Sequence, residues 1–465
     1  MTKVLFLLAF AATAAAQGDE VATTMTAAAP VAPRAPIRMR AGNPAATVYG
    51  SAQIKTYAKL KSLLQDADKG EVGQIFQLAT GEYREVGEYT INAHGVTIMA
   101  KHSGKVVLRP HSAGLRIIIA GHNNTVSGLQ FVDGAGVSGK AIIEVTGSHN
   151  TLTNLNFYNM DATHYVKFVE GSKKNTLSYT NIEYKPALAA VESGALVVVE
   201  SSATVPGHHL ISRCGIHAIP GSEGTFGVEP IKIGSEHEHV GRNVIEFTLF
   251  NGTGLGAAES VAVRCGQNVV RYSTFTNNNN AMLSFLGGDY NAAYGNWFMG
   301  AGGFSIGEAN NLYIYNNYFQ SAGTDELATS PLTFVGPATG TDATTGRPVY
   351  AEPSPEFKNN VVVAHNTFIE CQYINLGWVA TDKNAYFVNN LLKRSEGNLF
   401  AGISAPVHFS GNAFSGALGA SLDNSFEASE FAEVPAAGLF EWQGAYGYYA
   451  PGNARYRPLP PTPLI

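Results

Sequence analysis

The sequence has few charged residues and few cysteines. Only 14% of its 465 residues are charged, which excludes a bundle of helices rich in Lys and Glu. Three cysteines cannot all pair within one chain, and Cys214, Cys265 and Cys371 lie in apolar, strand-like contexts. We expect buried reduced thiols in preference to a single disulfide.

Long apolar runs and an excess of positive charge are also missing. After the first residues, no stretch approaches the ~20 uninterrupted apolar residues of a transmembrane helix, and the end lacks the hydrophobic tail of a lipid anchor. We therefore expect no membrane anchor. The formal net charge of −6 argues against nucleic acid as a partner. A polyanionic partner would have to be attracted by a local basic patch.

What the sequence does contain begins with a segment typical of a signal peptide. Lys3 precedes an apolar run at 4–12, and small residues at 14–16 precede Gln17. We predict a signal peptide at 1–16 and a secreted, extracellular protein. Residues 17–46 are rich in Ala, Thr and Pro without periodicity, which predicts a disordered linker. The folded domain is predicted at 47–440 and an extended tail at 441–465.

A short helix is predicted at the start of the folded domain. Within residues 53–67, Ile54, Leu60, Leu63 and Leu64 stand at helical spacing. Repeat proteins need such a cap, because an open end exposes the core and a strand edge.

The most informative feature is an internal repeat of about 20 to 26 residues, which suits one coil of a solenoid. Apolar residues alternate within each copy, so one face of each short strand points inward. Neither a leucine-rich consensus nor a 3.6-residue pattern occurs. Asn at equivalent turns tolerates left-handed backbone, and aromatic residues stack in the core. Four copies pair an Asn with a Phe at a constant interval: Asn124 and Phe131, Asn150 and Phe157, Asn243 and Phe250, Asn268 and Phe275.

These features predict an all-β protein, a single-stranded right-handed parallel β-helix with a short N-terminal capping helix. Parallel strands from successive coils would pair along the whole solenoid and leave edges only at its ends.

A succession of motifs over roughly residues 50–400 resembles polysaccharide lyase family 6, which includes alginate lyases and chondroitinase B. In order, these motifs are FVDGAG, GVEPIKIGS, NVIEFTLFNGTG, ESVAVRCGQN, GGFSIGEANNLYIYNNYF and VVVAHNTFIECQYINLG. The resemblance implies β-elimination on a uronic-acid polysaccharide such as alginate. It also implies a calcium ion that neutralises the sugar carboxylate, a Lys as base and an Arg as acid.

The calcium ligands implied by the resemblance are only partly present. Glu259 falls at the second acidic ligand, but Ala257 replaces the first. The ligand Asn expected just before Glu229 is absent, since 225–227 reads Thr-Phe-Gly. We assign calcium to Glu259 by resemblance, and these departures predict an incomplete site.

The catalytic pair is altered as well. Arg264 stands at the base position, and a guanidinium with a pKa above ~12 is a poor proton acceptor, although it can bind a carboxylate. The strand that carries the family's acid reads MLSFLG in this sequence. Phe285 therefore stands where the resemblance implies the acidic Arg, and Leu286 stands where it implies a His. Ser305 replaces a further Arg of the family. Arg264 and Glu259 remain as catalytic candidates.

Four residues are predicted to bind substrate. Lys232 and Glu229 belong to the strand EPIKIG beside the altered centre, and His237 and His239 follow in the loop SEHEH. The two histidines would share one face of an extended chain and could bind substrate or transfer a proton. A solvated polar loop is the alternative interpretation.

Three hypotheses about function remain open. The first is a secreted lyase with rearranged catalytic residues that acts on alginate-type uronan, since Arg264 or Lys232 could neutralise the carboxylate and a His or Tyr could take the proton. The second is a non-catalytic relative that binds polyuronate along its groove. The third is a uronan epimerase, whose reaction begins with the same proton abstraction.

Overall fold

The computed structural model places the described residues in one of the chain's two units, Tyr49–Ile465; the other unit is Met1–Val48. The predicted signal peptide (1–16), linker (17–46) and tail (441–465) lie outside the described residues. The structure describes residues 54–185, 194–219, 228–235, 237–253, 259–278, 281–322, 330–335, 338–341, 348–350, 359–377, 379, 383–403, 407–417, 419 and 431–433.

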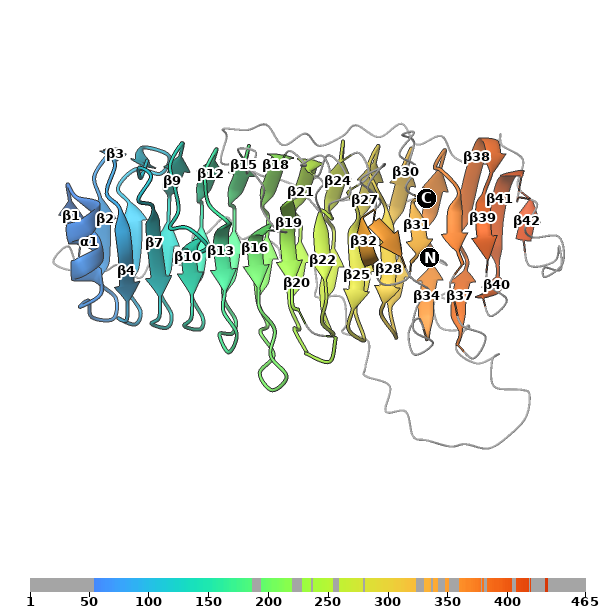
Figure 1. Cartoon of the computed structure of the whole chain (residues 1–465), viewed down its shortest axis with the longest axis horizontal. Coiled ribbons are helices and arrows are strands. Elements are labelled where there is room, and N and C mark those ends of the chain that lie inside the picture. The colour runs from blue at the N-terminus through green and yellow to red at the C-terminus, as the bar shows by residue number, and fades with distance from the viewer. Residues whose placement is uncertain are drawn as a thin grey trace, which may run out of the picture. The chain divides into compact units, whose positions relative to one another are not determined.

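The chain winds through three parallel sheets in turn, so that each coil adds one strand to each sheet (Figure 1). Sheet A has 14 strands. They are β1 Ile54–Tyr57, β2 Ile75–Leu78, β5 Thr97–Ala100, β8 Thr125–Ser127, β11 Thr151–Thr153, β14 Thr176–Ser178, β17 Leu210–Ser212, β20 Val244–Glu246, β23 Val269–Arg271, β26 Ala292–Tyr294, β29 Tyr313–Tyr315, β34 Val361–Ala364, β37 Ala385–Val388 and β40 Val407–Ser410.

Sheet B also has 14 strands, and its order again follows the order of the coils. They are β3 Gly81–Tyr83, β6 Val106–Leu108, β9 Leu129–Val132, β12 Asn156–Tyr158, β15 Asn181–Glu183, β18 Gly215–Ile219, β21 Leu249–Thr253, β24 Thr274–Thr276, β27 Trp297–Met299, β30 Tyr318–Gln320, β35 Thr367–Ile369, β38 Leu391–Asn398, β41 Asn412–Ala417 and β42 Phe431–Glu433.

Sheet C has 12 strands and faces the viewer in Figure 1. They are β4 Gly87–Ile91, β7 Leu115–Ile119, β10 Ala141–Val145, β13 His164–Phe168, β16 Gly194–Val199, β19 Val228–Ile233, β22 Val261–Val263, β25 Leu283–Gly287, β28 Phe304–Glu308, β31 Leu332–Phe334, β36 Ile374–Leu376 and β39 Phe400–Ile403. A separate antiparallel hairpin joins β32 Ala338–Thr341 to β33 Pro348–Tyr350. The predicted parallel β-helix is confirmed.

Stacked aromatic rings fill the core, as the repeat predicts. Phe250, Phe275 and Phe298 are fully buried on consecutive strands of sheet B, and neighbouring rings lie 4.6 Å apart and within 4° of parallel. The same column continues through Phe319 to Phe368 at 4.8 and 4.6 Å. Because neighbouring coils supply identical side chains, each ring packs against the ring of the next coil.

Buried asparagines join the coils at the turn before sheet A. Asn150 Oδ1 accepts the backbone N–H of Asn124, and Asn150 Nδ2 donates to the Gly121 carbonyl. Asn243, Asn268 and their successors repeat this pattern. Each amide therefore satisfies backbone groups that the turn would otherwise leave buried and unpaired.

One coil of this ladder was not predicted from the repeat. His209 occupies the Asn position between Asn175 and Asn243, and Ile216 occupies the aromatic position of that coil. The imidazole is 2% exposed and stacks on Phe168 at 4.7 Å. The fold thus contains a coil in which His and Ile replace both residues that define the repeat.

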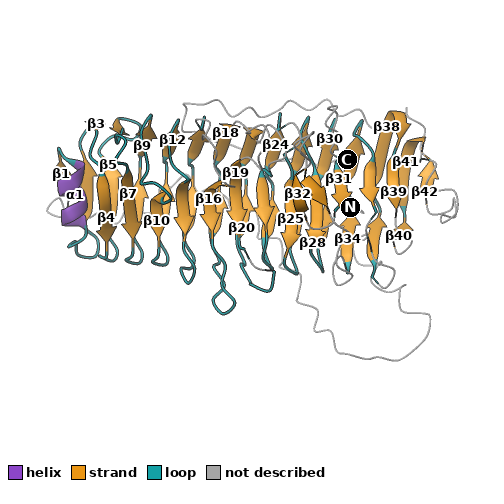
Figure 2. Cartoon of the chain, viewed as in Figure 1, coloured by secondary structure: helices purple, strands orange, loops and turns teal. Residues whose placement is uncertain are grey.

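The capping helix is confirmed, but it is shorter than predicted. Figure 2 shows α1, Leu60–Ala67, at one end of the rows of strands. Its apolar face buries Leu60, Leu63, Leu64 and Ala67. Ile54 was wrongly placed in this helix: it lies 41% exposed in β1, which pairs with β2. The backbone is extended at Lys59 (φ −135°, ψ 131°), so the helix cannot begin earlier.

The three cysteines are buried and unpaired, as expected. Among the residues that the structure describes, no helix has both the length and the apolar character needed to cross a membrane.

Candidate functional site

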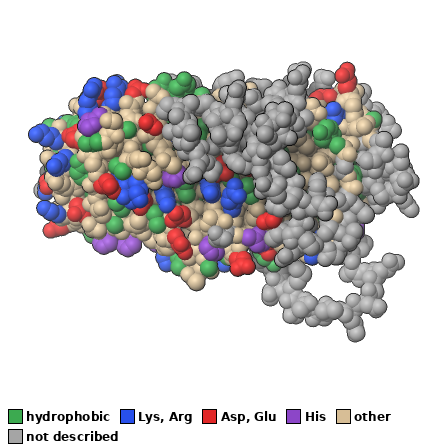
Figure 3. Space-filling model, in the orientation of Figure 1, with side chains coloured by type: hydrophobic (Ala, Val, Ile, Leu, Met, Phe, Trp, Pro, Cys, Tyr) green, Lys and Arg blue, Asp and Glu red, His purple; other side chains and the backbone are tan. Residues whose placement is uncertain are grey.

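Four consecutive strands of sheet C, β13, β16, β19 and β22, carry the predicted site. Alternate residues of each strand face outward, so side chains at equivalent positions form columns across the coils. Lys167 of β13 and Lys232 of β19 share one such column, separated by Val198 of β16. Figure 3 shows Lys, Arg, Asp and Glu side chains grouped on this face. We call it the charged face.

Arg264 and Glu229 meet on the charged face. Arg264 directly follows β22, and its Nη2 donates to Glu229 Oε1 at 3.4 Å. The Glu229 side chain is only 8% exposed and that of Arg264 is 36% exposed. Arg264 Nε is buried and has no acceptor among the described residues. The guanidinium therefore neutralises a buried carboxylate on one side and has hydrogen-bonding capacity left over.

Glu259, half-buried at the start of the same coil, is the second carboxylate of the site. Its loss of hydration and the negative charge of Glu229 raise its pKa to about 7, and the positive charges of Arg264 and Lys232 oppose this increase. A carboxyl group with such a pKa exchanges protons near neutral pH. Lys232 forms no ion pair with any described residue, and its ammonium lies near enough to Glu259 to favour the ionised carboxylate.

His164, at the start of β13, also belongs to the site and was not predicted. Its Nδ1 lies 2.5 Å from the Ala195 carbonyl, which can only accept, so Nδ1 carries the hydrogen and Nε2 the lone pair. Burial lowers the pKa of His164. Three nearby cations act in the same direction: Lys167, Lys185 and Lys232. His164 is therefore a neutral imidazole beside a group of lysines.

Lys185 is a buried lysine near His164. It is 1% exposed, its Nζ donates to the Ala162 carbonyl, and it lies 5.2 Å from the centre of the Tyr165 ring. Burial lowers its pKa to about 8. No local pattern could reveal this environment, because it is created by the packing of separate coils.

The structure does not place the two predicted histidines on a shared face. His237 Nδ1 accepts the backbone N–H of Gly288 at 2.7 Å, and its Nε2 lies 3.5 Å from Asp289 Oδ1. His239 lies 3.1 Å from Ser201 Oγ, on an earlier coil. His237 thus contacts the coil of β25, two coils later, and His239 contacts the preceding coil, that of β16.

β25 is the strand that the resemblance expects to carry the catalytic acid. At the position assigned to that acid, its side chain points into the core. Phe285 is fully buried and lies 6.2 Å from the Phe304 ring, so a substrate-binding Arg could not occupy this position. A shift of one residue reverses the face of a strand. The outward positions here are Ser284 and Leu286, and neither can act as an acid. Ser305 pairs with Ser284 and is 2% exposed.

The described residues of the site offer a calcium ion few of the ligands that it needs. Calcium takes six to eight oxygen ligands, mostly carboxylates and carbonyls. Glu259 and Glu229 are two carboxylates, and Glu229 already accepts a hydrogen bond from the guanidinium of Arg264. Within the described ranges, no three His, Cys, Asp or Glu side chains converge as metal ligands would. Among the described residues of the site, Arg264 and Lys232 carry positive charge.

Together, the fold and the charged face define a class: a parallel β-helix protein with a surface site suited to an anionic ligand. The family model described as Chondroitinase B matches residues 55–396. The chain therefore belongs to the chondroitinase B family, and the resemblance to polysaccharide lyase family 6 is confirmed. No curated protein matches the chain.

Solved structures of family 6 lyases share the fold. A mannuronic acid specific enzyme from the human gut microbiota is 19% identical, with a TM-score of 0.64 over 83% of this chain and 92% of that one. The alginate lyase AlyGC is 19% identical, with a TM-score of 0.63 over 82% and 53%. A family 6 lyase from Pseudopedobacter saltans is 16% identical, with a TM-score of 0.57 over 82% and 98%.

Proposed function

We propose that the protein is a lyase that cleaves an alginate-type uronic-acid polysaccharide by β-elimination on the charged face. The observation that supports this most directly is the meeting of Arg264 and Lys232, two cations, with Glu259, whose pKa lies near 7. Family membership supports the reaction type. The similar structures include a mannuronic acid specific lyase and alginate lyases, which supports the substrate class.

In the proposed reaction, positive side chains make the sugar's C5 proton removable. Arg264 and Lys232 bind the uronate carboxylate and stabilise the charge that develops on it. Ionised Glu259 accepts the C5 proton, the C4–O bond breaks, and a C4=C5 double bond forms. Glu259 then returns the proton to the leaving oxygen. Arg264, at the position of the family's base, serves as a cation and not as a proton acceptor.

This reaction needs no calcium. The guanidinium beside Glu229 supplies the positive charge for which the resemblance implied a metal ion. Activity should therefore be independent of divalent cations.

The test is absorbance from the new carbon–carbon double bond on incubation with polymannuronate, polyguluronate, alginate and dermatan sulfate. We expect Arg264→Ala and Glu259→Gln each to lower kcat/KM at least 100-fold, since each removes charge stabilisation or the proton acceptor. Arg242→Ala is the matched control, because Arg242 is an exposed arginine that bonds Gln267 on another part of the coil. Full activity in both site variants would place the reaction elsewhere.

A second candidate function is non-catalytic binding of polyuronate. It is favoured by one observation: no lysine or tyrosine occupies the base position, where Arg264 is bound to Glu229. Saturable binding without absorbance on any uronan would establish this function. An epimerase would instead show solvent deuterium at C5 in an uncleaved polymer.

We further propose that the protein is exported, on the strength of Lys3, the apolar run at 4–12 and the small residues at 14–16. The mature protein recovered from the medium should begin at Gln17 by mass spectrometry. An intact Met1 in that protein would contradict the predicted cleavage.

A further inference from the structure

A second surface feature lies where sheet A turns into sheet B, away from the charged face. Four consecutive coils place large side chains at the same turn position: Tyr179, Arg213, Phe247 and Tyr272. Tyr272 is 45% exposed and the other three are partly exposed. They occupy the same coils as β13, β16, β19 and β22. We call these four residues the turn strip.

The backbone at the turn strip would suit other residues better. All four residues have left-handed backbone, with φ between 49° and 57°. A bulky side chain is less favourable than glycine in this conformation. Coils on either side use residues that tolerate this conformation, namely Asn154, Gly295, Asn316 and Asn389. The turn itself therefore does not require aromatic or arginine side chains.

The guanidinium of Arg213 lies between two aromatic rings. Its Cζ is 5.8 Å from the centre of the Tyr179 ring and 5.0 Å from that of Phe247. The next ring, Tyr272, lies 5.3 Å from Phe247. Because a ring of the adjacent coil lies on each side of the guanidinium, we expect a ligand to approach along its N–H edge, which is the edge that binds a carboxylate.

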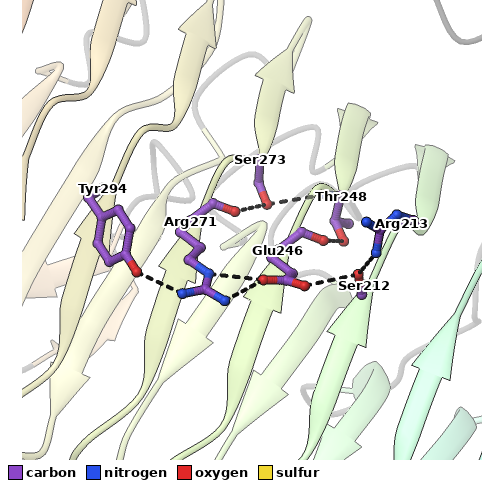
Figure 4. Close-up of polar contacts among 7 residues, drawn as sticks. All are labelled: Ser212, Arg213, Glu246, Thr248, Arg271, Ser273 and Tyr294. Atoms are coloured by element: carbon purple, nitrogen blue, oxygen red, sulfur yellow. Dashed lines mark hydrogen bonds and ion pairs between the residues drawn. The ribbon is translucent and has the colours of Figure 1, made fainter. Parts of the chain in front are cut away.

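Arg213 is a cation without an acidic partner among the described residues. Its Nη1 donates to Ser212 Oγ at 3.0 Å, and its Nε is buried without an acceptor. The neighbouring Arg271 differs, because it donates twice to Glu246 at 2.9 and 2.6 Å and once to Tyr294. Figure 4 shows Arg271 held between Glu246 and Tyr294, whereas Arg213 reaches only Ser212. The net charge of this region is therefore positive.

We propose that the turn strip is a second binding site for the uronic-acid polysaccharide. Arg213 would bind a sugar carboxylate through its free edge, and the rings of Tyr272 and Tyr179 would pack against the apolar faces of neighbouring sugars. Three steps between coils of ~4.8 Å make the strip about 14 Å long. Such a site would hold a long polymer on the enzyme while another segment occupies the charged face. This inference rests on the proposed function for the identity of its ligand.

Affinity electrophoresis in gels that contain polymeric alginate tests the turn strip. The starting variant is the full chain with Lys232→Ala and Arg264→Ala, which remove the cations of the charged face. We expect the polymer still to retard this variant. Adding Arg213→Met keeps the side-chain stem but removes the charge, and should weaken retardation at least tenfold. Arg242→Met removes an exposed charge from another turn and should have no effect.

Tyr272→Ala provides a second variant, because an exposed ring can be removed without opening the core. It should also weaken retardation several-fold while thermal unfolding stays unchanged. The proposal is overturned if the charged-face variant is not retarded, or if Arg213→Met and Arg242→Met behave alike. Failure of the proposed function has a different signature, since wild-type protein would then form no double bond even where the turn strip binds polymer.

Discussion

His209 should make the protein sensitive to acid well above the pH at which its carboxylates are protonated. The Asn175 backbone N–H donates to Nδ1 of His209, so Nε2 carries the hydrogen, and this N–H is buried. Burial lowers the pKa of His209 from 6.5 to about 4. The folded protein therefore holds this imidazole neutral, whereas the unfolded chain protonates it in mild acid.

The sign and size of the effect follow from linkage. A histidine with a lowered pKa contributes stability that is complete above about 6.5 and is lost as pH falls toward 4. At pH 4.5 the folded imidazole is mostly neutral and the unfolded one almost fully charged. The free energy of unfolding should then be lower by about 2.5 kcal/mol than at pH 7 on account of His209 alone.

The assay is denaturant unfolding of wild type and His209→Asn between pH 7.5 and 4.5. Asn is the residue that neighbouring coils carry at this position, so the variant retains a ladder side chain without a titrating group. The stability difference between the two proteins should shift by about 2.5 kcal/mol in favour of the variant as pH falls. A difference that stays constant over this range would refute the assignment of a neutral, low-pKa imidazole.

Four further predictions concern the core, the thiols and the site. Phe275→Ala should lower the free energy of unfolding by about 3–5 kcal/mol in denaturant titrations, because it removes a buried ring stacked on both neighbours. Thiol reagents should not label the native protein, since burial raises the pKa of Cys214 and Cys371 to about 12, and labelling should follow unfolding. On a uronan that the protein cleaves, kcat/KM should rise with pH through about 7, as Glu259 ionises, and Glu259→Gln should abolish this rise; a rise retained in the variant would assign the titration to another group. EDTA should leave the cleavage rate unchanged, and a loss of activity restored by calcium would contradict the fit of the site.

The fold could be predicted from the sequence because most coils repeat the same pattern of residues. A buried amide at one turn and a ring in the core recur at nearly constant spacing, and alternation identifies the inward face. The coil of His209 and Ile216 lacks the pattern of the repeat because both positions carry other residues. A longer stretch also separates it from its neighbours: Ile182, Ile216 and Phe250 pair in register at 34-residue intervals.

The site could be predicted only in part. The resemblance located Arg264 and Glu229, which the structure brings together. It could not locate His164 or Lys185, because they lie far away in sequence and reach the site only through stacking of coils. It also misjudged the face of Phe285, since an alignment of a short strand does not fix whether a side chain points inward or outward.

A second row of buried asparagines, at the turn before sheet B, has a consequence for the way this protein can change. Its hydrogen bonds between Asn296 and Asn317, Asn366 and Asn390, and Asn390 and Asn412 join residues 21 to 24 positions apart, yet Asn317 donates to Asn366 Oδ1 at 3.0 Å across 49 positions. The next coil resumes in register, with Tyr318 opposite Thr367. Extra chain can thus be added at the edge of one coil without disturbing those on either side, because each coil depends only on its neighbours. Loops exchanged between relatives at this position offer a route to new specificities on an unchanged scaffold.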